Sequence, residues 1–253
     1  MCGQRRHPAL SFLRLYSRRG AGDGHPGSGG RQLADTARAQ GSPSSPATLK
    51  WCRAARRDKL FINTAGIGAI PADIRWGTQQ ISAGDVLLVS GTLGDHGATI
   101  LNLREQMGLD GALSSDCAVL TPLIQTLRPL SGVKALRDAT RGGVNAVAHE
   151  FAAASGCGIE LQEATLPVND TVRGVCELLG LDALNFANEG KLVLAVARDE
   201  AENVLAHLRS HALGRDAAII GEVVVRPGVR SVGLYGVKRT LDLPHAEPLP
   251  RIC

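Results

Sequence analysis

The sequence lacks the features that would indicate a membrane protein or a metalloprotein. No stretch approaches the roughly 18 consecutive apolar residues of a membrane-spanning helix, so we expect no membrane span. The six cysteines form no CxxC pair and show no metal-ligand spacing with histidine. We interpret them as mostly reduced thiols of a cytoplasmic protein, three of them being small hydrophobic residues of the core, namely Cys117, Cys157 and Cys176.

Acidic residues are scarce at the start of the chain. Residues 1–57 contain 11 Lys or Arg but only Asp23 and Asp35, a net charge of +9, whereas the whole chain carries +4. The rest of the chain is therefore acidic overall, with a net charge of −5. The basic character belongs to the first segment and gives no indication that the rest of the chain binds nucleic acid.

From residue 58 onward, hydrophobic periodicity predicts interleaved strands and helices. Short apolar or alternating runs bounded by turn residues predict strands at 60–68, 85–90, 158–162, 191–196, 217–225 and 230–235. Apolar residues three and four apart predict helices at 98–107, 122–130, 143–155, 170–179 and 199–211. This interleaving predicts an α/β (α+β) class, with a mixed sheet covered on one face by helices.

Two glycine-rich loops each lead into a predicted helix. In Ser90-Gly-Thr-Leu-Gly-Asp-His-Gly97 the backbone N–H groups and the helix start could bind an anion, and His96 could donate to a phosphate. The alternative is a plain turn with Asp95 as helix cap, where His96 satisfies loop carbonyls. In Asp138-Ala-Thr-Arg-Gly-Gly143, Arg141 could bind a phosphate and Asp138 or Thr140 could cap the helix, or Arg141 could simply pair with Asp138 at the surface.

A third motif, Asn188-Glu-Gly-Lys191, lies just before a predicted strand. A glutamate on a glycine-flanked turn can point into a cleft and transfer a proton. Turn chemistry alone explains the Asn-Glu-Gly sequence equally well.

The chain ends in Pro250-Arg-Ile-Cys253, which places a thiol at its last residue. Three of the 12 prolines lie in residues 243–253 and favour an extended tail. A thiolate is a good nucleophile, and a terminal one can be loaded at one site and presented at another. An incidental terminal cysteine is the alternative.

Together these motifs resemble the HypE family of hydrogenase expression/formation proteins, from about Asp58 to Cys253. The resemblance implies the C-terminal domain of the aminoimidazole-ribonucleotide-synthetase-like fold. It implies maturation of nickel-iron hydrogenase, in which a carbamoyl group on Cys253 is dehydrated with ATP to a thiocyanate, the source of the iron-bound cyanide. Glu189 would lie near the incoming cysteine as the acid/base residue. From its place in the 90–97 loop we also count His96 as a candidate catalytic residue, with its role left open. The two glycine loops would face the nucleotide through Asp95, Gly97, Asp138, Thr140, Arg141, Gly142 and Gly143.

The resemblance also implies cofactors and partners. These are ATP and Mg²⁺, the carbamoyltransferase HypF as donor, the HypC–HypD iron-ligand scaffold complex as recipient, and a second copy of the chain in a homodimer. We expect neither a nucleic acid nor a membrane as partner, and a cytoplasmic location.

Residues 1–57 do not match the family, and they are open to three interpretations: a transit peptide, a disordered segment, or a frameshifted translation. The third is favoured, because the genetic code permits a family-like sequence in the shifted frame across Gly41–Arg57. We therefore expect an out-of-frame segment at 1–57, the end of the ATP-binding domain at 58–78, the synthetase-like domain at 79–240 and a tail at 241–253. The family has a functional lysine at a position that falls in the shifted segment. Lys50 lies at about that place, but its neighbours differ, so we do not assign it the role. We expect no ATPase activity from this chain.

Two alternatives to the dehydratase remain. The chain could be a carrier that presents Cys253 to partners without catalysis. It could also be a relative acting as an ATP-dependent purine or thiamine-phosphate enzyme, although such relatives have no use for a terminal thiol.

Overall fold

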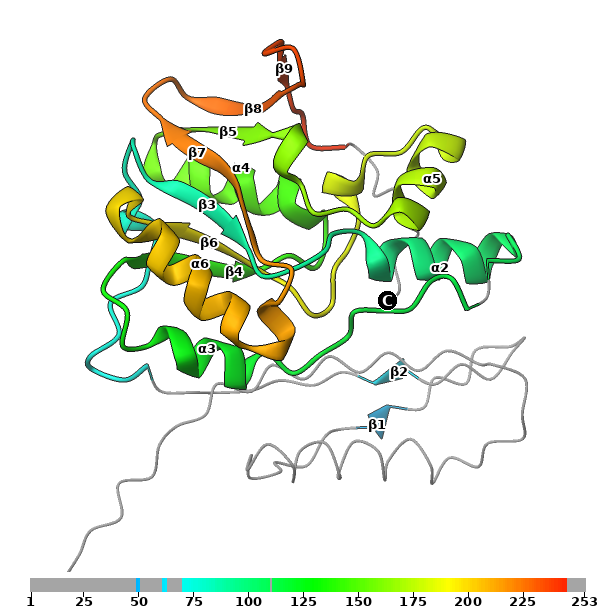
Figure 1. Ribbon diagram of the computed structural model, residues 1–253, viewed down its shortest axis with the longest axis horizontal. Helices are drawn as coiled ribbons and strands as arrows, with labels where there is room; N and C mark the ends of the chain where they lie inside the picture. The colour runs from blue at the N-terminus through cyan, green and yellow to red at the C-terminus, as the bar shows by residue number, and fades with distance from the viewer. Residues whose placement is uncertain (1–48, 51–60, 63–69, 110, 245–253) are drawn as a thin grey trace, which may run out of the picture. The chain divides into compact units, whose positions relative to one another are not determined.

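The computed structural model describes residues 49–50, 61–62, 70–109 and 111–244 (Figure 1). The chain divides into two compact units, residues 1–74 with 251–253, and residues 75–250. In the first unit, strand β1 (Leu49–Lys50) pairs antiparallel with β2 (Phe61–Ile62). Most of the predicted out-of-frame segment and the last nine residues, including Cys253, lie outside the described residues, and the predicted domain boundaries stay predictions.

The second unit is built on a seven-stranded sheet with the order β4-β6-β3-β7-β5-β8-β9. Only β5 and β8 run parallel among these neighbours, so the sheet is mixed, as predicted. The strands are β3 (Val86–Val89), β4 (Val133–Asp138), β5 (Gly158–Gln162), β6 (Leu192–Val196), β7 (Ala218–Val224), β8 (Gly228–Val232) and β9 (Lys238–Thr240). The helices are α2 (Asp95–Glu105), α3 (Thr121–Leu127), α4 (Gly143–Ser155), α5 (Asp170–Leu179) and α6 (Ala201–Ser210), with short 3₁₀ turns at Thr78–Gln80, Glu163–Thr165, Ala183–Asn185, Arg198–Glu200 and Ala212–Gly214.

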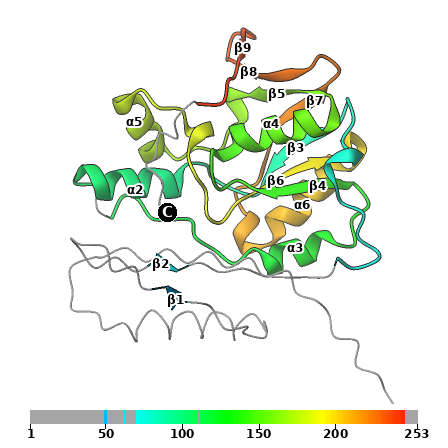
Figure 2. The same cartoon turned by 180° about the vertical axis from the view of Figure 1, so that it is seen from behind.

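Helices cover both faces of this sheet, not one as predicted. Alternate residues of a strand point to opposite faces, and in β3 Leu87 and Val89 join the core on the α4 side, whereas Val86 and Leu88 join the core that contains α3 and α6. Figures 1 and 2 show α4 on one side of the strands and α3 with α6 on the other. The fully buried β3 and β6 read as continuous apolar runs for this reason.

Helices α2 and α5 pack on each other beyond the sheet and form a third, smaller core. Its buried members include Ala98 and Leu101 of α2, Val172 and Val175 of α5, and Phe186. Leu178 is 74% exposed at the end of α5.

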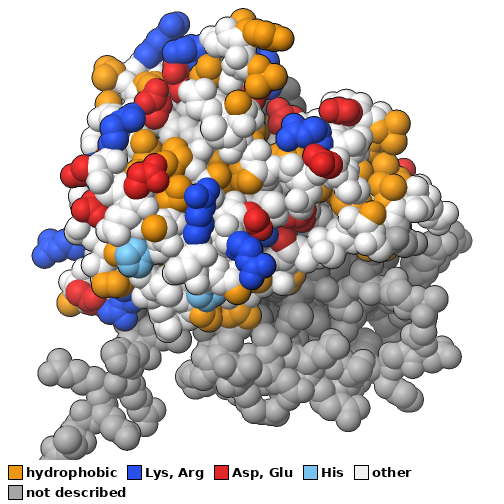
Figure 3. All heavy atoms as spheres, viewed as in Figure 1, with side chains coloured by type: hydrophobic (Ala, Val, Ile, Leu, Met, Phe, Trp, Pro, Cys, Tyr) orange, Lys and Arg blue, Asp and Glu red, His pale blue; other side chains and the backbone are white. Residues whose placement is uncertain are grey.

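Over the face drawn in Figure 3, Lys and Arg side chains are interspersed with Asp and Glu.

No helix in the described part of the chain is both long and apolar enough to cross a membrane. The three cysteines found there are free, but only Cys176 is buried. Cys157 is partly buried against the main core. Cys117 is exposed, which corrects its prediction as a core residue, because it lies in the extended segment between α2 and α3.

Candidate functional site

The three sequence motifs meet at one end of the sheet. The 90–97 loop follows β3, the 138–143 loop follows β4, and the 188–191 turn precedes β6, which lies between those two strands. Because both strands run antiparallel to β6, their C-terminal ends lie beside its start. Backbone hydrogen bonds join the segments, from Ser90 N to Leu192 O at 3.0 Å and from Ala139 N to Lys191 O at 3.2 Å.

Asn188 ties the three segments together. Its buried side-chain oxygen accepts a hydrogen bond from Gly94 N at 2.8 Å. Its Nδ2 donates to Ala139 O at 3.1 Å and to Phe186 O at 2.9 Å. Asn188 is part of a predicted motif, but the sequence indicates no role of its own for it, since Gly94 and Ala139 lie far away in the chain.

The 90–97 loop enters α2 through a glycine. Gly94 is the N-cap in the left-handed conformation, with φ 85°, so Asp95 is not the cap and the helix begins three residues earlier than predicted. The Asp95 carboxylate instead accepts from the Thr92 hydroxyl and, at 2.7 Å, from Asn169 Nδ2. A Cβ at Gly97 would lie 2.8 Å from the Cβ of Phe186, so close helix packing explains this glycine.

His96 points into the protein and not toward the loop carbonyls. It is buried, its Nδ1 lies 2.9 Å from Ser115 Oγ, and its Nε2 is buried without a hydrogen-bond partner among the described residues. Burial lowers the pKa of His96, and the Asp116 carboxylate opposes this effect only partly. The side chain therefore favours the neutral form.

The 138–143 loop also enters its helix through glycine. Gly142, with φ 72°, is the N-cap of α4, and no side chain of the described residues caps the helix, which corrects the predicted capping by Asp138 or Thr140. Thr140 Oγ1 donates to Asp138 Oδ2 at 3.0 Å instead. Gly143 has φ 61°, and a Cβ there would collide with the carbonyl oxygens of Leu184 and Phe186. Arg141 is exposed at the loop surface.

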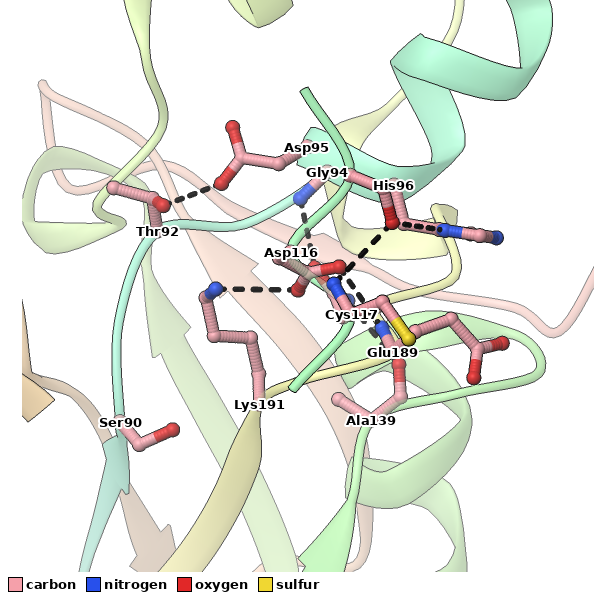
Figure 4. Close-up of polar contacts among 12 residues, drawn as sticks. Ser90, Thr92, Gly94, Asp95, His96, Asp116, Cys117, Ala139, Glu189 and Lys191 are labelled. Atoms are coloured by element: carbon pink, nitrogen blue, oxygen red, sulfur yellow. Dashed lines mark hydrogen bonds and ion pairs between the residues drawn. The ribbon is translucent and has the colours of Figure 1, made fainter. Parts of the chain in front are cut away.

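Glu189 sits on a turn that is held by Asp116, a residue the sequence analysis did not single out. Asp116 Oδ1 accepts from Glu189 N at 3.0 Å, and Asp116 Oδ2 lies 3.2 Å from Lys191 Nζ. Both charged side chains are largely removed from solvent, with 3% of Asp116 and 12% of Lys191 exposed. Figure 4 shows Asp116 between Lys191 and the Glu189 backbone.

The exposed thiol of Cys117 lies beside this turn (Figure 4). Partial burial raises the pKa of Cys117, and the negative charges of Glu189 and Asp116 raise it further. The negative charge of Glu189 therefore acts on this thiol, and the Glu189 side chain is half-buried at the surface of the site.

On the other side of Asp116 a cleft of about 500 Å³ opens between the 90–97 loop, the 112–116 segment and the start of α5. It is polar, and its lining includes Thr92, Asp95, Ser115, Asp116, Asn169, Asp170 and Lys191. Within the described ranges no three His, Cys, Asp or Glu side chains are grouped so that they could hold a metal ion. These residues therefore do not fit the expected Mg²⁺ by themselves, although carboxylates and a lysine leave room for a polar ligand.

Comparison with known proteins identifies the domain. Residues 82–233 match the family "AIR synthase related protein, C-terminal domain". The chain is 76% identical over 221 residues to the carbamoyl dehydratase HypE of Escherichia coli K12, covering 87% of this chain and 66% of that protein. It is 42% identical over 224 residues to the Cupriavidus necator protein of the same name, of which it covers 64%. The chain thus spans a little less than two thirds of the length of these relatives.

Solved structures agree. The E. coli HypE crystal structure matches with a TM-score of 0.84 at 74% identity, covering 87% of this chain and 69% of that one. A HypE–HypF complex matches at 0.80 and 40% identity, covering 85% and 70%, and a HypE structure in complex with ATP at 0.72 and 37%, covering 79% and 62%. From its seven-stranded sheet, its converging motif loops and these similarities, the chain belongs to the HypE family and carries that family's AIR synthase-related C-terminal domain.

Proposed function

We propose that this protein takes part in nickel-iron hydrogenase maturation by converting a carbamoyl group on the Cys253 thiol to a thiocyanate at the expense of ATP. The observation that carries the proposal is the convergence of the 90–97 loop, the 138–143 loop and the 188–191 turn around Glu189. The 76% identity to a carbamoyl dehydratase supports it. Weaker likeness to a thiamine-monophosphate kinase from Stenotrophomonas maltophilia, at 26% identity and a TM-score of 0.51, does not favour the thiamine-phosphate alternative.

The reaction has two chemical steps. The amide oxygen of the thiocarboxamide attacks the γ-phosphorus of ATP, ADP leaves, and one N–H proton is lost, which gives a phosphorylated imidate. Loss of the second N–H proton then expels phosphate and leaves the sulfur-bound nitrile. Phosphorylation is needed because an amide oxygen is otherwise a poor leaving group.

Glu189 is the residue that we assign to these proton transfers. A carboxylate on a fixed turn can accept an N–H proton when the substrate lies within hydrogen-bond reach. The backbone of the 90–97 and 138–143 loops, together with Arg141, would face the phosphates. His96 favours its neutral form and is buried, so its contribution would be to hold the 115–116 segment through Ser115.

The ATP-dependent step needs more than the described residues offer. Residues 1–57 contain only Asp23 and Asp35, and no metal-binding cluster occurs in the described part of the chain. We propose that residues 1–57 are an out-of-frame segment, and that ATP and Mg²⁺ bind the half encoded in the restored frame. Sequencing the gene around the codons for Arg56–Asp58 tests this directly.

The partners follow from the same proposal. HypF would load the thiol, as the solved HypE–HypF complex of a relative supports, the HypC–HypD complex would receive the cyanide, and the protein would act as a cytoplasmic homodimer. The free thiols of Cys117, Cys157 and Cys176 are compatible with a reducing compartment.

Mass spectrometry of the C-terminal peptide tests the function. The frame-restored protein is incubated with HypF, carbamoyl phosphate and ATP, with and without the Cys253→Ala substitution. We expect a carbamoyl adduct on Cys253 that loses the mass of one water when ATP is present. An adduct on another cysteine with Cys253 unmodified contradicts the proposal.

A further inference from the structure

One carboxylate, that of Asp116, contacts the turn that carries Glu189 at two points. Asp116 Oδ1 accepts the Glu189 amide at 3.0 Å, and Asp116 Oδ2 pairs with Lys191 at 3.2 Å. Glu189 and Lys191 flank Gly190, so the Asp116 carboxylate bridges the two ends of this three-residue segment. A short bridge at both ends of a turn restricts the backbone dihedrals that aim the side chain.

Gly190 makes this arrangement possible. A Cβ at Gly190 would collide with the carbonyl oxygen of Asp116, so the 115–117 segment and the 188–191 turn are in direct backbone contact. On the far side, Lys191 O accepts from Ala139 N and Asn188 is fixed by its three hydrogen bonds. The Glu189 backbone is therefore supported from two directions.

The ion pair of Asp116 and Lys191 is almost completely removed from solvent. Only 3% of the Asp116 side chain and 12% of the Lys191 side chain are exposed. Each charge has therefore lost most of its hydration and is stabilised chiefly by the opposite charge of its partner. Replacing a buried ion pair by apolar residues is often neutral or stabilising, so stability alone does not account for this pair.

We infer that Asp116 is a positioning residue for Glu189: it holds the Glu189 amide with one oxygen and Lys191 with the other, and so keeps the Glu189 carboxylate aimed at the segment that carries Cys117. Its importance for catalysis rests on the proposed acid/base role of Glu189. The position of the Glu189 side chain can be measured in this chain without enzymatic turnover, through the pKa of the neighbouring Cys117 thiol.

The reactivity of the Cys117 thiol reports the position of the Glu189 carboxylate. The negative charges of both Glu189 and Asp116 raise the pKa of this thiol, and among the described residues Lys191 and His96 also interact with Asp116. The pH dependence of Cys117 alkylation by iodoacetamide, followed by peptide mass spectrometry, reports the thiol pKa. If Glu189 stays beside the thiol, Glu189→Gln lowers that pKa and speeds alkylation at pH 8 about threefold, which corresponds to about half a pKa unit.

The test is a double-mutant cycle on the 253-residue chain. Asp116→Asn alone lowers the Cys117 pKa by removing a charge. If Asp116 positions Glu189, then Glu189→Gln has less than a third of its wild-type effect when made in the Asp116→Asn background. Asn has one acceptor oxygen and cannot serve both the Glu189 N–H and Lys191, so the turn no longer holds the Glu189 carboxylate beside the thiol. Additive effects of the two substitutions mean that Asp116 is only a second charge, and they overturn the inference.

The chain offers a matched control in Asp85, which is also buried and pairs with Lys134 at 2.7 Å. In an Asp85→Asn background, Glu189→Gln must keep its full effect on Cys117, and loss of the effect there as well overturns the inference by pointing to general destabilisation. If Asp116→Asn shows no cooperative thermal transition, Lys191→Gln replaces it in the same cycle with the same expected non-additivity.

The catalytic consequence is measured separately in the frame-restored protein. Asp116→Asn should lower kcat for nitrile formation at least tenfold, with little change in KM for ATP. Absence of nitrile formation in the unsubstituted protein would defeat the proposed function while the alkylation cycle still decides the role of Asp116.

Discussion

The backbone amide of Gly94 donates a 2.8 Å hydrogen bond to the side-chain oxygen of Asn188, which lies 94 residues further along the chain. This bond connects the start of α2 with the turn that carries Glu189. Because Asn188 also donates to Ala139 and Phe186, the two glycine loops and the turn that carries Glu189 share one buried anchor. This side chain therefore adds a shared anchor to the backbone hydrogen bonds that already join the three segments.

Asn188→Ala should cost about 3 kcal/mol of unfolding free energy. The substitution leaves buried backbone groups of Gly94 and Phe186 without this partner, and an unsatisfied buried group costs roughly 1–3 kcal/mol. Urea denaturation followed by circular dichroism measures the change. Asn203→Ala, on the exposed face of α6, is the control and should change stability by less than about 0.5 kcal/mol.

Gly190→Ala and Gly174→Ala should shift stability in opposite directions. A Cβ at Gly190 would collide with Asp116 O, whereas one at Gly174, on the exposed face of α5, meets nothing within 4 Å. We expect a loss of about 1–3 kcal/mol at Gly190 from overpacking, and a gain of about 0.5–1 kcal/mol at Gly174 from helix propensity. Thermal denaturation of the two variants measures both. Equal effects would show that the 115–117 segment does not pack on the turn.

His96 should make folding sensitive to pH. Burial lowers its pKa, so below about pH 6.5 the unfolded chain binds a proton that the folded chain resists. The stability due to the neutral imidazole is fully present above that pH and is lost as the pH falls through it. Unfolding free energies between pH 5.5 and 7.5 should rise less steeply with pH in His96→Gln than in the parent chain. His207→Gln, on the exposed face of α6, controls for the loss of an imidazole.

Cys176 should resist alkylation until the domain unfolds. It is buried, and burial together with Asp182 raises its pKa to about 11. Labelling with iodoacetamide at pH 8 should modify exposed Cys117 first, and modification of Cys176 should follow the urea unfolding curve. Cys176 belongs to the third, smaller core, which α2 and α5 form. Equal rates for both thiols in the native protein would contradict this placement.

The sequence predicts the central strands and the long helices well and misses the sheet edges. The bounds of α4, α5 and β5 agree with the predicted ranges, because their hydrophobic patterns are continuous and their ends carry turn residues. The two strands of the seven-stranded sheet that the pattern does not predict, β4 and β9, are its two edges. Edge strands are half solvated, and Lys134, Arg137 and the three residues of β9 break the apolar pattern that reveals a buried strand.

The candidate site was only partly predictable for a similar reason. Glycine loops and the Glu189 turn are local patterns, and the sequence shows them. The pair of Asp116 and Lys191 is 75 positions apart, and Asp116 follows no motif, so its role appears only when the strands bring the two segments together. The prediction of Cys117 as a core residue is wrong because it lies outside any helix or strand, in the segment between α2 and α3, where it is exposed beside Glu189.

The most direct test of the central claim is the fate of the carbamoyl group in a Glu189→Gln variant. The frame-restored protein and its variant are loaded by HypF with carbamoyl phosphate, given ATP, and digested for mass spectrometry of the peptide that ends in Cys253. The proposed mechanism predicts that both accept the carbamoyl group equally, that the unsubstituted protein then loses the mass of one water, and that the variant stays carbamoylated, with conversion slowed at least a hundredfold. Conversion of the variant at the parental rate would contradict the assignment of Glu189 as the proton-transferring residue.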